Sequence, residues 1–218
     1  MKGLLIKDFL VILKQFRFSA IAIGLWMILG MFFDAAQYQI FIPLFCTTLV
    51  TSCVANDETS CFQKYMEILP VNRKQIVSEK YVLAIILATI GLALFLGLSA
   101  TEMLLAGTFE FKSLILTGVL SVVASLFLPA LSIPLFLHWG VAKGRIIYMI
   151  FISALGIGIV TVLNDFYYNL AELPHPAVTL IKCFSHPATV AAIGIAGVAV
   201  LLLISWAIAV KLYQSKEA

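Results

Sequence analysis

Charged residues are scarce in this chain. Only 11% of its 218 residues are Asp, Glu, Lys or Arg, and 62% are hydrophobic, whereas soluble domains carry roughly 25% charged residues. The mean hydropathy of +1.09 agrees with this composition. A soluble enzyme, a nucleic-acid-binding module and a disulfide scaffold are therefore excluded. A helix that spans a bilayer needs about 20 mostly apolar residues, so the apolar content is enough for about six spans.

Motifs of catalysis and nucleotide binding are also missing from the sequence. The string from Gly107 to Ser113 comes nearest to a phosphate-binding loop, but Phe111 stands where that loop needs glycine. The four cysteines are scattered over the predicted spans and both sides, which favours small apolar fillers or free thiols over a metal site. No pair of catalytic residues lies within the predicted spans, which argues against an intramembrane protease. We expect no enzyme here and no cofactor in this chain.

Windows without Asp, Glu, Lys or Arg predict six transmembrane helices in an all-α, polytopic membrane protein. The fourth window holds Pro129 and Pro134, so we expect a kinked or tilted helix that ends near Leu137. The last helix is expected to begin at Pro187 or Ala188, because proline suits the first turn of a helix. The six windows are 18–33, 35–55, 81–101, 113–142, 146–164 and 183–210.

The segment 1–17 mixes basic and apolar residues, unlike a cleaved signal peptide. One half of its helical wheel holds Lys7, Asp8, Lys14, Gln15 and Arg17, and the other holds Leu5, Ile6, Phe9, Leu13 and Phe16. This pattern predicts an amphipathic helix in the membrane interface with its cations toward the headgroups. A simple cytoplasmic extension of the first span is the alternative.

The basic residues predict the orientation of a single transmembrane domain over residues 1–218. With the N-terminus inside, 12 of the 14 Lys and Arg residues fall on the cytoplasmic side, and only Lys112 and Lys182 fall outside. Because cytoplasmic loops carry the excess of positive charge, we predict that both termini are cytoplasmic. No charge is expected in the middle of a span, so the energy source of a pump would lie in another chain.

The cytoplasmic connection 56–80 divides at Leu69-Pro70. Before this point, four apolar residues at helical spacing form one stripe on a short helix. They are Phe62, Tyr65, Met66 and Leu69. After it, Asn72 can cap a second helix that runs into the third span. The short helix is suited to dock in a groove of a soluble partner, but an interfacial helix packed on lipid explains the stripe equally well.

This connection resembles the signature of the type-2 (ABC-2-type) permeases of bacterial ABC exporters. In that family an acidic residue follows span two, and a Lys-Tyr-rich helix, a Leu-Pro-Val-Ser-Arg-Lys turn and a Ser-x-Lys-Tyr entry to span three come next. The matching residues are Asp57-Glu58, Lys64-Tyr65, Leu69-Pro70-Val71-Asn72-Arg73-Lys74 and Ser78-Glu79-Lys80-Tyr81. The opening, Met1 to Asp8, is also similar, and the size resembles that of the permeases of phenol-soluble-modulin exporters.

The resemblance implies a membrane subunit that lacks its own ATPase. A separate cytoplasmic ABC ATPase subunit would bind Mg-ATP and hydrolyse it, and two permeases, identical or related, would pair with two ATPases in a bacterial plasma membrane. The residues that couple to the ATPase would be Lys64, Tyr65, Glu67, Leu69, Pro70, Val71, Asn72, Arg73 and Lys74. The turn from Gly140 to Arg145, with Lys143, Gly144 and Arg145, would be a second cytoplasmic contact.

The resemblance also implies a gate in the outer loop 165–182, where short helices dip back toward the membrane. An apolar plug could be formed there by Phe166, Tyr167, Tyr168 and Leu170. A plain aromatic belt at the membrane interface is the equal alternative.

The uncharged spans predict an amphipathic or lipid-like substrate that enters from the inner leaflet. Amphipathic peptide is the first expectation, partly from the resemblance, and lipid or hydrophobic antibiotic is the second. Membrane lipid surrounds the chain, and nucleic acid is not an expected partner. The alternative of another class is a membrane scaffold or regulatory protein that transports nothing.

Overall fold

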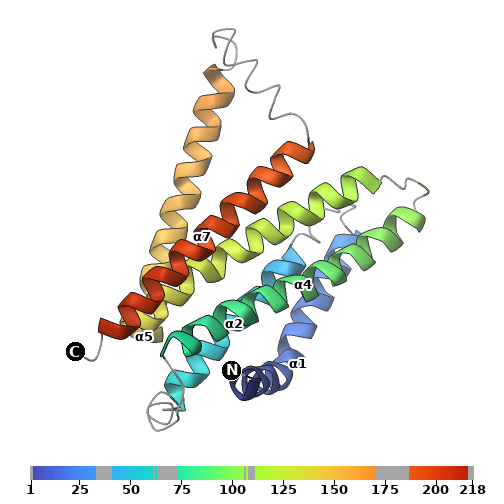
Figure 1. The fold of residues 1–218 in the computed structure, drawn as a ribbon. Helices are drawn as coiled ribbons and strands as arrows, with labels where there is room; N and C mark the ends of the chain where they lie inside the picture. The colour runs from blue at the N-terminus through green and yellow to red at the C-terminus, as the bar shows by residue number, and fades with distance from the viewer. Residues whose placement is uncertain are drawn as a thin grey trace.

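The computed structural model describes residues 2–32, 41–60, 62, 73–105, 107, 111–169 and 187–215. In these ranges the chain forms five helices and no strand, which confirms the all-α fold (Figure 1). The helices are α1 (Lys2–Phe32), α2 (Phe41–Thr59), α4 (Arg73–Leu105), α5 (Phe111–Asn169) and α7 (Pro187–Ser215). The predicted start of the last helix at Pro187 is confirmed.

Three stretches of the described helices are long and apolar enough to cross a membrane. They are Lys74–Leu104, Leu114–Gly158 and Ala191–Tyr213. The first begins earlier than the predicted window 81–101, because α4 already starts at Arg73 and continues without a break. The chain is thus a membrane protein, and the full set of six spans stays a prediction.

The chain reverses within α5 at Gly140, not at a proline. Pro129 and Pro134 both lie inside the helix, and Gly140 has φ 76° and ψ 165°, a region of backbone space that is essentially restricted to glycine. Figure 1 shows the two arms of α5 diverging from this bend. The helix therefore passes the predicted end near Leu137 and turns three residues later.

Helix α1 runs as one helix from Lys2 to Phe32. This agrees with the alternative prediction, in which residues 1–17 extend the first span, and an interfacial helix over 1–17 is not confirmed. The polar half of the predicted helical wheel does not face only headgroups, because Asp8 is buried, whereas Ile6 and Phe9 are exposed. The N-terminal turns of α1 therefore direct a charged side chain into the protein.

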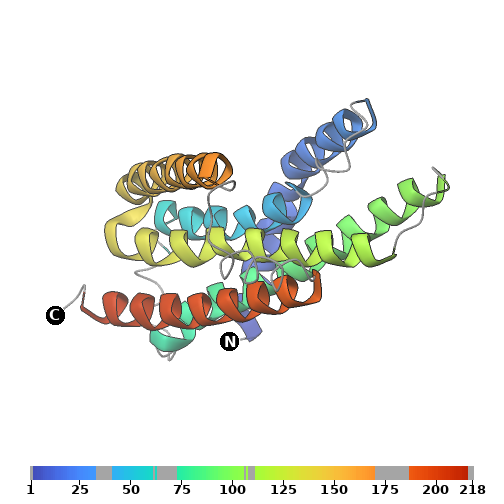
Figure 2. The ribbon, with the colours of Figure 1, turned by 90° about the horizontal axis from the view of Figure 1, so that it is seen from above.

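The helices converge at one end of the molecule, which we call the basal end. Figure 1 shows there both termini, the end of α2, the start of α4 and the bend of α5, while the helices spread apart toward the opposite end. In Figure 2 the first arm of α5 runs between α7 and the second arm. Helix α5 packs against α2, α4 and α7, and α1 packs against α2 and α4.

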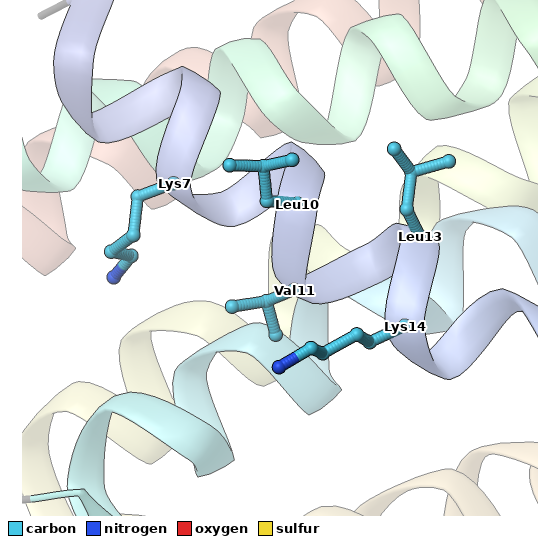
Figure 3. Close-up of a pocket in the computed structure, with 5 residues that line it drawn as sticks. All are labelled: Lys7, Leu10, Val11, Leu13 and Lys14. Atoms are coloured by element: carbon cyan, nitrogen blue, oxygen red, sulfur yellow. The ribbon is translucent and has the colours of Figure 1, made fainter.

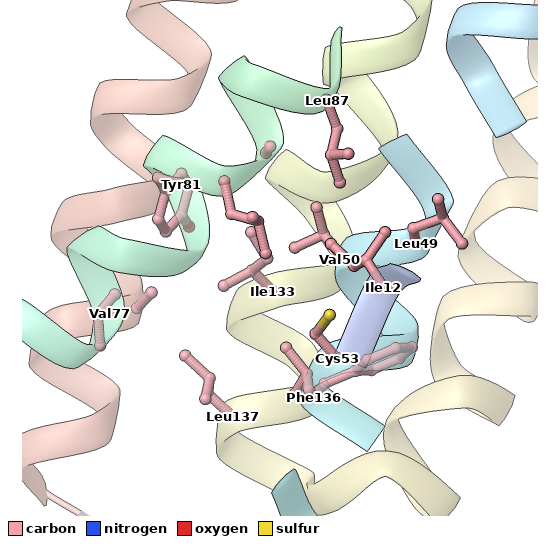
Figure 4. Packing of buried hydrophobic residues seen from close by; sticks show 14 of the residues in the cluster. Ile12, Leu49, Val50, Cys53, Val77, Tyr81, Leu87, Ile133, Phe136 and Leu137 are labelled. Carbon is pink, nitrogen blue, oxygen red and sulfur yellow. The ribbon is translucent and has the colours of Figure 1, made fainter. Parts of the chain in front are cut away.

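All five described helices contribute to the main apolar core, whose packing Figure 4 shows from close by. Its fully buried members include Ile12 of α1, Val50 of α2, Val77 of α4, Ile133 of α5 and Ala209 of α7. These positions fall in the last half of α2, the first turns of α4, the turns before the bend of α5 and the end of α7. The core thus fixes the helices at the end where the polar connections emerge.

Hydroxyl side chains join the helices around this core. The Tyr81 hydroxyl lies 2.6 Å from Ser205 Oγ, and Ser205 Oγ donates a hydrogen bond to the carbonyl oxygen of Ala130. Trp206 Nε1 donates to Ser78 Oγ at 2.9 Å. Such polar contacts between helices are typical of membrane proteins, whose interior gains little from the hydrophobic effect. These hydrogen bonds fix the positions of α4, α5 and α7 relative to one another.

Candidate functional site

Five ionisable side chains from α1, α2 and α4 meet at the basal end. We call them the charge cluster: Lys7, Asp8, Asp57, Glu79 and Lys80. Asp8, Glu79 and Lys80 are each at most 2% exposed, and Asp57 is also buried. Burying a charge without a partner is costly, so the side chains of the cluster have to satisfy one another.

Lys80 of α4 is the buried cation of the charge cluster. Its Nζ donates a hydrogen bond to Asp8 Oδ2 of α1 and another, at 2.6 Å, to Asp57 Oδ2 of α2. Glu79 Oε2 lies 3.7 Å from the same nitrogen. One lysine therefore links three helices.

Lys7 of α1 closes the arrangement from the outer side. Its Nζ lies 2.5 Å from Asp57 Oδ1 and 2.9 Å from Asp8 Oδ1. The two aspartates and two lysines thus form a closed ring in which positive and negative groups alternate. The same ammonium also lies 3.9 Å from the centroid of the Phe62 ring, a distance at which cations are attracted to aromatic faces.

The ring keeps Asp8 ionised. Burial by itself would raise the pKa of the Asp8 carboxyl, but the Lys80 ammonium, with contacts from Glu79 and Lys7, lowers the pKa below its ordinary value. The contact between α1 and α4 is therefore an ion pair at neutral pH. Glu79 adds a third carboxyl group near Lys80, and its buried Oε1 has no hydrogen-bond partner among the described residues.

Glu58, the residue after Asp57, ties α2 to the bend of α5. Glu58 Oε2 accepts a hydrogen bond from the Val141 N–H at 2.5 Å. Val141 begins the second arm of α5, so the carboxylate satisfies a free amide at a helix N-terminus and faces the positive end of the helix dipole. A Cβ placed on Gly140 would lie 3.0 Å from Glu58 Oε1, so this close contact depends on the glycine.

Seven of the nine predicted coupling residues lie outside the described residues: Lys64, Tyr65, Glu67, Leu69, Pro70, Val71 and Asn72. Arg73 is the first residue of α4, and Lys74 follows it with an exposed side chain. A helix that begins after Asn72 and continues into a span is thereby confirmed. Phe62, from the predicted apolar stripe, packs against Leu4 of α1 and Ile76 of α4.

The second predicted contact, Lys143, Gly144 and Arg145, occupies the first turns after the bend of α5. Lys143 and Arg145 are exposed, and Gly144 is buried. A Cβ on Gly144 would lie 2.8 Å from Phe136 Cδ1, so the two arms of α5 approach closely at this position. Through Glu58 and Val141, the structure brings this turn to the end of α2, where the coupling segment begins.

Three of the four predicted gate residues lie at the far end of the second arm of α5. Phe166, Tyr167 and Tyr168 belong to the last turns of the helix, which continues to Asn169. The first residues of the predicted loop 165–182 are therefore helical. Leu170 and the rest of that loop lie outside the described residues.

The sequence interpretation missed the charge cluster. It placed Lys7, Asp8, Asp57 and Lys80 among the cytoplasmic charges, without contacts between them. One signal was present, because Glu79-Lys80 directly precedes an apolar window and follows the apolar pair Ile76-Val77. A charged pair between apolar residues of one helix indicates burial with partners from neighbouring helices.

Apolar helices that converge at one end, where buried ion pairs connect them, define a multi-pass membrane protein. A family model described as ABC-2 family transporter protein matches residues 3–214. The match covers nearly the whole chain, so the chain belongs to the ABC-2 transporter family, and the predicted family is confirmed. Searches among curated proteins and among solved structures find no match.

Membership of this family makes the chain a membrane subunit of an ABC transporter, not a catalytic enzyme. Permeases of this kind generally associate with an ABC ATPase and dimerise. The similarity to exporters of phenol-soluble modulins stays a prediction.

Proposed function

We propose that this chain is the permease subunit of an ATP-driven exporter that moves amphipathic peptides or other hydrophobic substrates out of a bacterial cell. Six spans, formed by α1, α2, α4, the two arms of α5 and α7, would cross the plasma membrane. The basal end would face the cytoplasm with both termini. The excess of Lys and Arg in the segments at this end supports the orientation. A separate subunit would hydrolyse Mg-ATP, and two permeases would pair in the assembly.

The observation that carries this proposal is the position of Asp57 and Glu58, where α2 leads into the coupling segment. Asp57 contacts Lys7 of α1 and Lys80 of α4, and Glu58 contacts the backbone at the bend of α5. A force applied to the segment by an ATPase would therefore reach four helices through two successive side chains. Because the ion pairs are buried, water would not compete for these contacts, and a displacement of α2 would move α1 and α4 with it.

Four cations of the basal end are the proposed contacts with the ATPase. Arg73 and Lys74 stand at the start of α4, and Lys143 and Arg145 follow the bend of α5. The first pair is continuous with the proposed coupling residues from Lys64 to Asn72. Both groups would meet acidic side chains of the partner, and opposite charges across an interface mainly set orientation and association rate.

A cavity between α2 and α5 supports an amphipathic substrate. It has a volume of about 290 Å³, and its lining includes the hydroxyls of Thr48 and Thr51, the cation of Arg145 and the apolar side chain of Met149. A wall of this mixed character suits a molecule with both polar and apolar faces better than a purely apolar lipid. At the opposite end, Phe166, Tyr167, Tyr168 and Leu170 would form the outer gate.

The coupling assignment is tested by reversing two charges at the start of α4. In the variant Arg73→Glu/Lys74→Glu, we expect weaker co-purification of the ATPase subunit and a loss of substrate-stimulated ATP hydrolysis, with normal membrane insertion. Lys211→Glu is the matched control, because Lys211 is another exposed cation near the basal end. Association and hydrolysis equal to wild type in the double variant would refute the coupling role.

The substrate class needs a separate measurement. The purified permease–ATPase complex in vesicles should hydrolyse ATP faster when an amphipathic helical peptide is added, and less so with a lipid or a hydrophobic antibiotic. A complex that forms but responds to none of the three would favour the regulatory scaffold over the exporter.

A further inference from the structure

A pocket on α1 near the basal end shares only Lys7 with the proposed coupling. Its volume is about 750 Å³, and it is lined by Lys7, Leu10, Val11, Leu13 and Lys14. Figure 3 shows the side chains of Lys7 and Lys14 extending to the same side of the helix, with Val11 between them. Two ammonium groups about two helical turns apart thus border a pocket whose remaining lining is apolar.

The face of α1 beside this pocket is apolar and uncovered. Ile6, Leu10 and Leu13 are 61%, 58% and 50% exposed, and their spacing places them on one side of the helix. Further along α1, Ile21 and Leu25 are also exposed. Large apolar side chains in such a row are stable outside the protein only in contact with acyl chains or another apolar surface. The row runs from the level of the lysines toward the opposite end of the molecule.

The charges of the pocket select an anionic occupant. Lys14 is exposed and makes no ion pair with the described residues, so its ammonium is available to a ligand. Lys7 is partly exposed, at 25% of its side chain, although it also contacts Asp8 and Asp57. Cations at the level of the headgroups, with apolar side chains next to them, are the arrangement by which interfacial helices hold acidic lipids.

We propose that this pocket binds an anionic phospholipid from the leaflet at the basal end, with the phosphate near Lys14 and Lys7 and the acyl chains along Leu10 and Leu13. The site requires only that the chain lies in a membrane, so it is independent of the coupling to an ATPase. The bound lipid would touch Lys7 and thereby the ring of ion pairs that joins α1 to α2 and α4.

Native mass spectrometry of the purified full-length protein tests this proposal. Phosphatidylglycerol and phosphatidylcholine of equal chain length are titrated separately, and the bound fraction is read for each. We expect phosphatidylglycerol to bind more tightly to the wild type, and Lys14→Gln to weaken its binding about fivefold, the equivalent of the ~1 kcal/mol that a basic residue contributes at an anionic surface. Phosphatidylcholine binding should not change in this variant.

Two further variants separate this site from general lipid contact. Lys211→Gln removes an exposed cation from α7 near the basal end and should leave the binding of both lipids unchanged. Leu10→Ser should weaken the binding of both lipids, because it removes a contact with the acyl chains.

Three outcomes would overturn the proposal: Lys14→Gln binds phosphatidylglycerol like the wild type, Lys211→Gln weakens this binding equally, or millimolar inorganic phosphate displaces the lipid. Dimerisation that Leu10→Ser abolishes, with lipid binding intact, would assign the face to a second copy instead.

Discussion

Asp8 of α1 and Asp57 of α2 bind the same two lysines. Lys80 contacts one oxygen of each carboxylate, and Lys7 contacts the other oxygen of each. Every charge in this ring therefore has two opposite neighbours, which offsets the cost of removing it from water. The arrangement joins α1, α2 and α4 at the position where the proposed coupling segment begins. It is the natural target for experiments on stability and on coupling.

The first prediction concerns the centre of the ring. Lys80→Met should lower the free energy of unfolding by about 3–5 kcal/mol, because two buried carboxylates lose the buried one of the two cations that they share. The measurement is thermal or denaturant-induced unfolding of the purified protein in detergent. Lys74→Met, at an exposed position of the same helix, should change the free energy by no more than about 0.5 kcal/mol. Equal stability of the two variants would show that the ring contributes nothing.

The second prediction concerns pH. Because the pKa of Asp8 is lowered in the folded protein, its contribution to stability is present above the pKa of the unfolded chain and is lost as the pH falls through the folded value. We expect stability to drop as the pH falls below about 4, near the ordinary pKa of aspartate. Asp8→Asn should be less stable at neutral pH and should lose less on acidification. A parallel pH profile in both proteins would contradict the ion pair.

The third prediction concerns the bend of α5. Gly140→Ala should destabilise the protein by about 1–3 kcal/mol, because the backbone conformation at this position is strained for any residue with a Cβ and Glu58 lies close by. Gly97→Ala is the matched control. Gly97 lies in α4 with open space around it, so alanine there should stabilise the helix by up to about 1 kcal/mol. Unfolding measurements with the same sign for both substitutions would reject this reason for the bend.

The fourth prediction separates binding of the ATPase from its coupling. Asp57→Asn leaves the cations Arg73, Lys74 and Lys143 in place, so the ATPase should still co-purify. Substrate-stimulated hydrolysis should fall about fivefold or more, the usual range for the loss of a coupling interaction, because α2 is no longer held by two ion pairs. Co-purification lost together with stimulation would mean that Asp57 acts by supporting the fold.

The fifth prediction tests the orientation. In a background with Cys61→Ser and Cys183→Ser, Lys74→Cys should react with a membrane-impermeant maleimide only after the cells are opened. Phe111→Cys, an exposed position at the opposite end of the molecule, should react in intact cells. The two remaining cysteines, Cys46 and Cys53, are buried and provide a low background. Labelling of Lys74→Cys from outside would reverse the proposed topology.

Local features of the chain made parts of the fold predictable. The start of α7 at Pro187 follows from the restricted backbone of proline, and Asn72, as a potential capping residue, predicted the helix that begins at Arg73. Both signals lie within a few residues of the feature that they specify. The turn between the fourth and fifth spans was predicted from Gly140 to Arg145, and the bend of α5 lies at its first residue, whereas Pro129 and Pro134 lie inside the helix. A proline kinks a helix, but only glycine readily adopts the backbone angles that reverse it here.

The apolar windows by themselves determined a membrane-embedded, all-helical chain, because a helix satisfies its own backbone hydrogen bonds in hydrocarbon. The motif at residues 57–81 was enough to indicate the family. Tertiary structure alone decided that Asp8 faces Lys80, a residue 72 positions away in the sequence, and that Glu58 caps the second arm of α5. A helical wheel records the sides of one helix, but which side is buried depends on the charges that neighbouring helices bring to it.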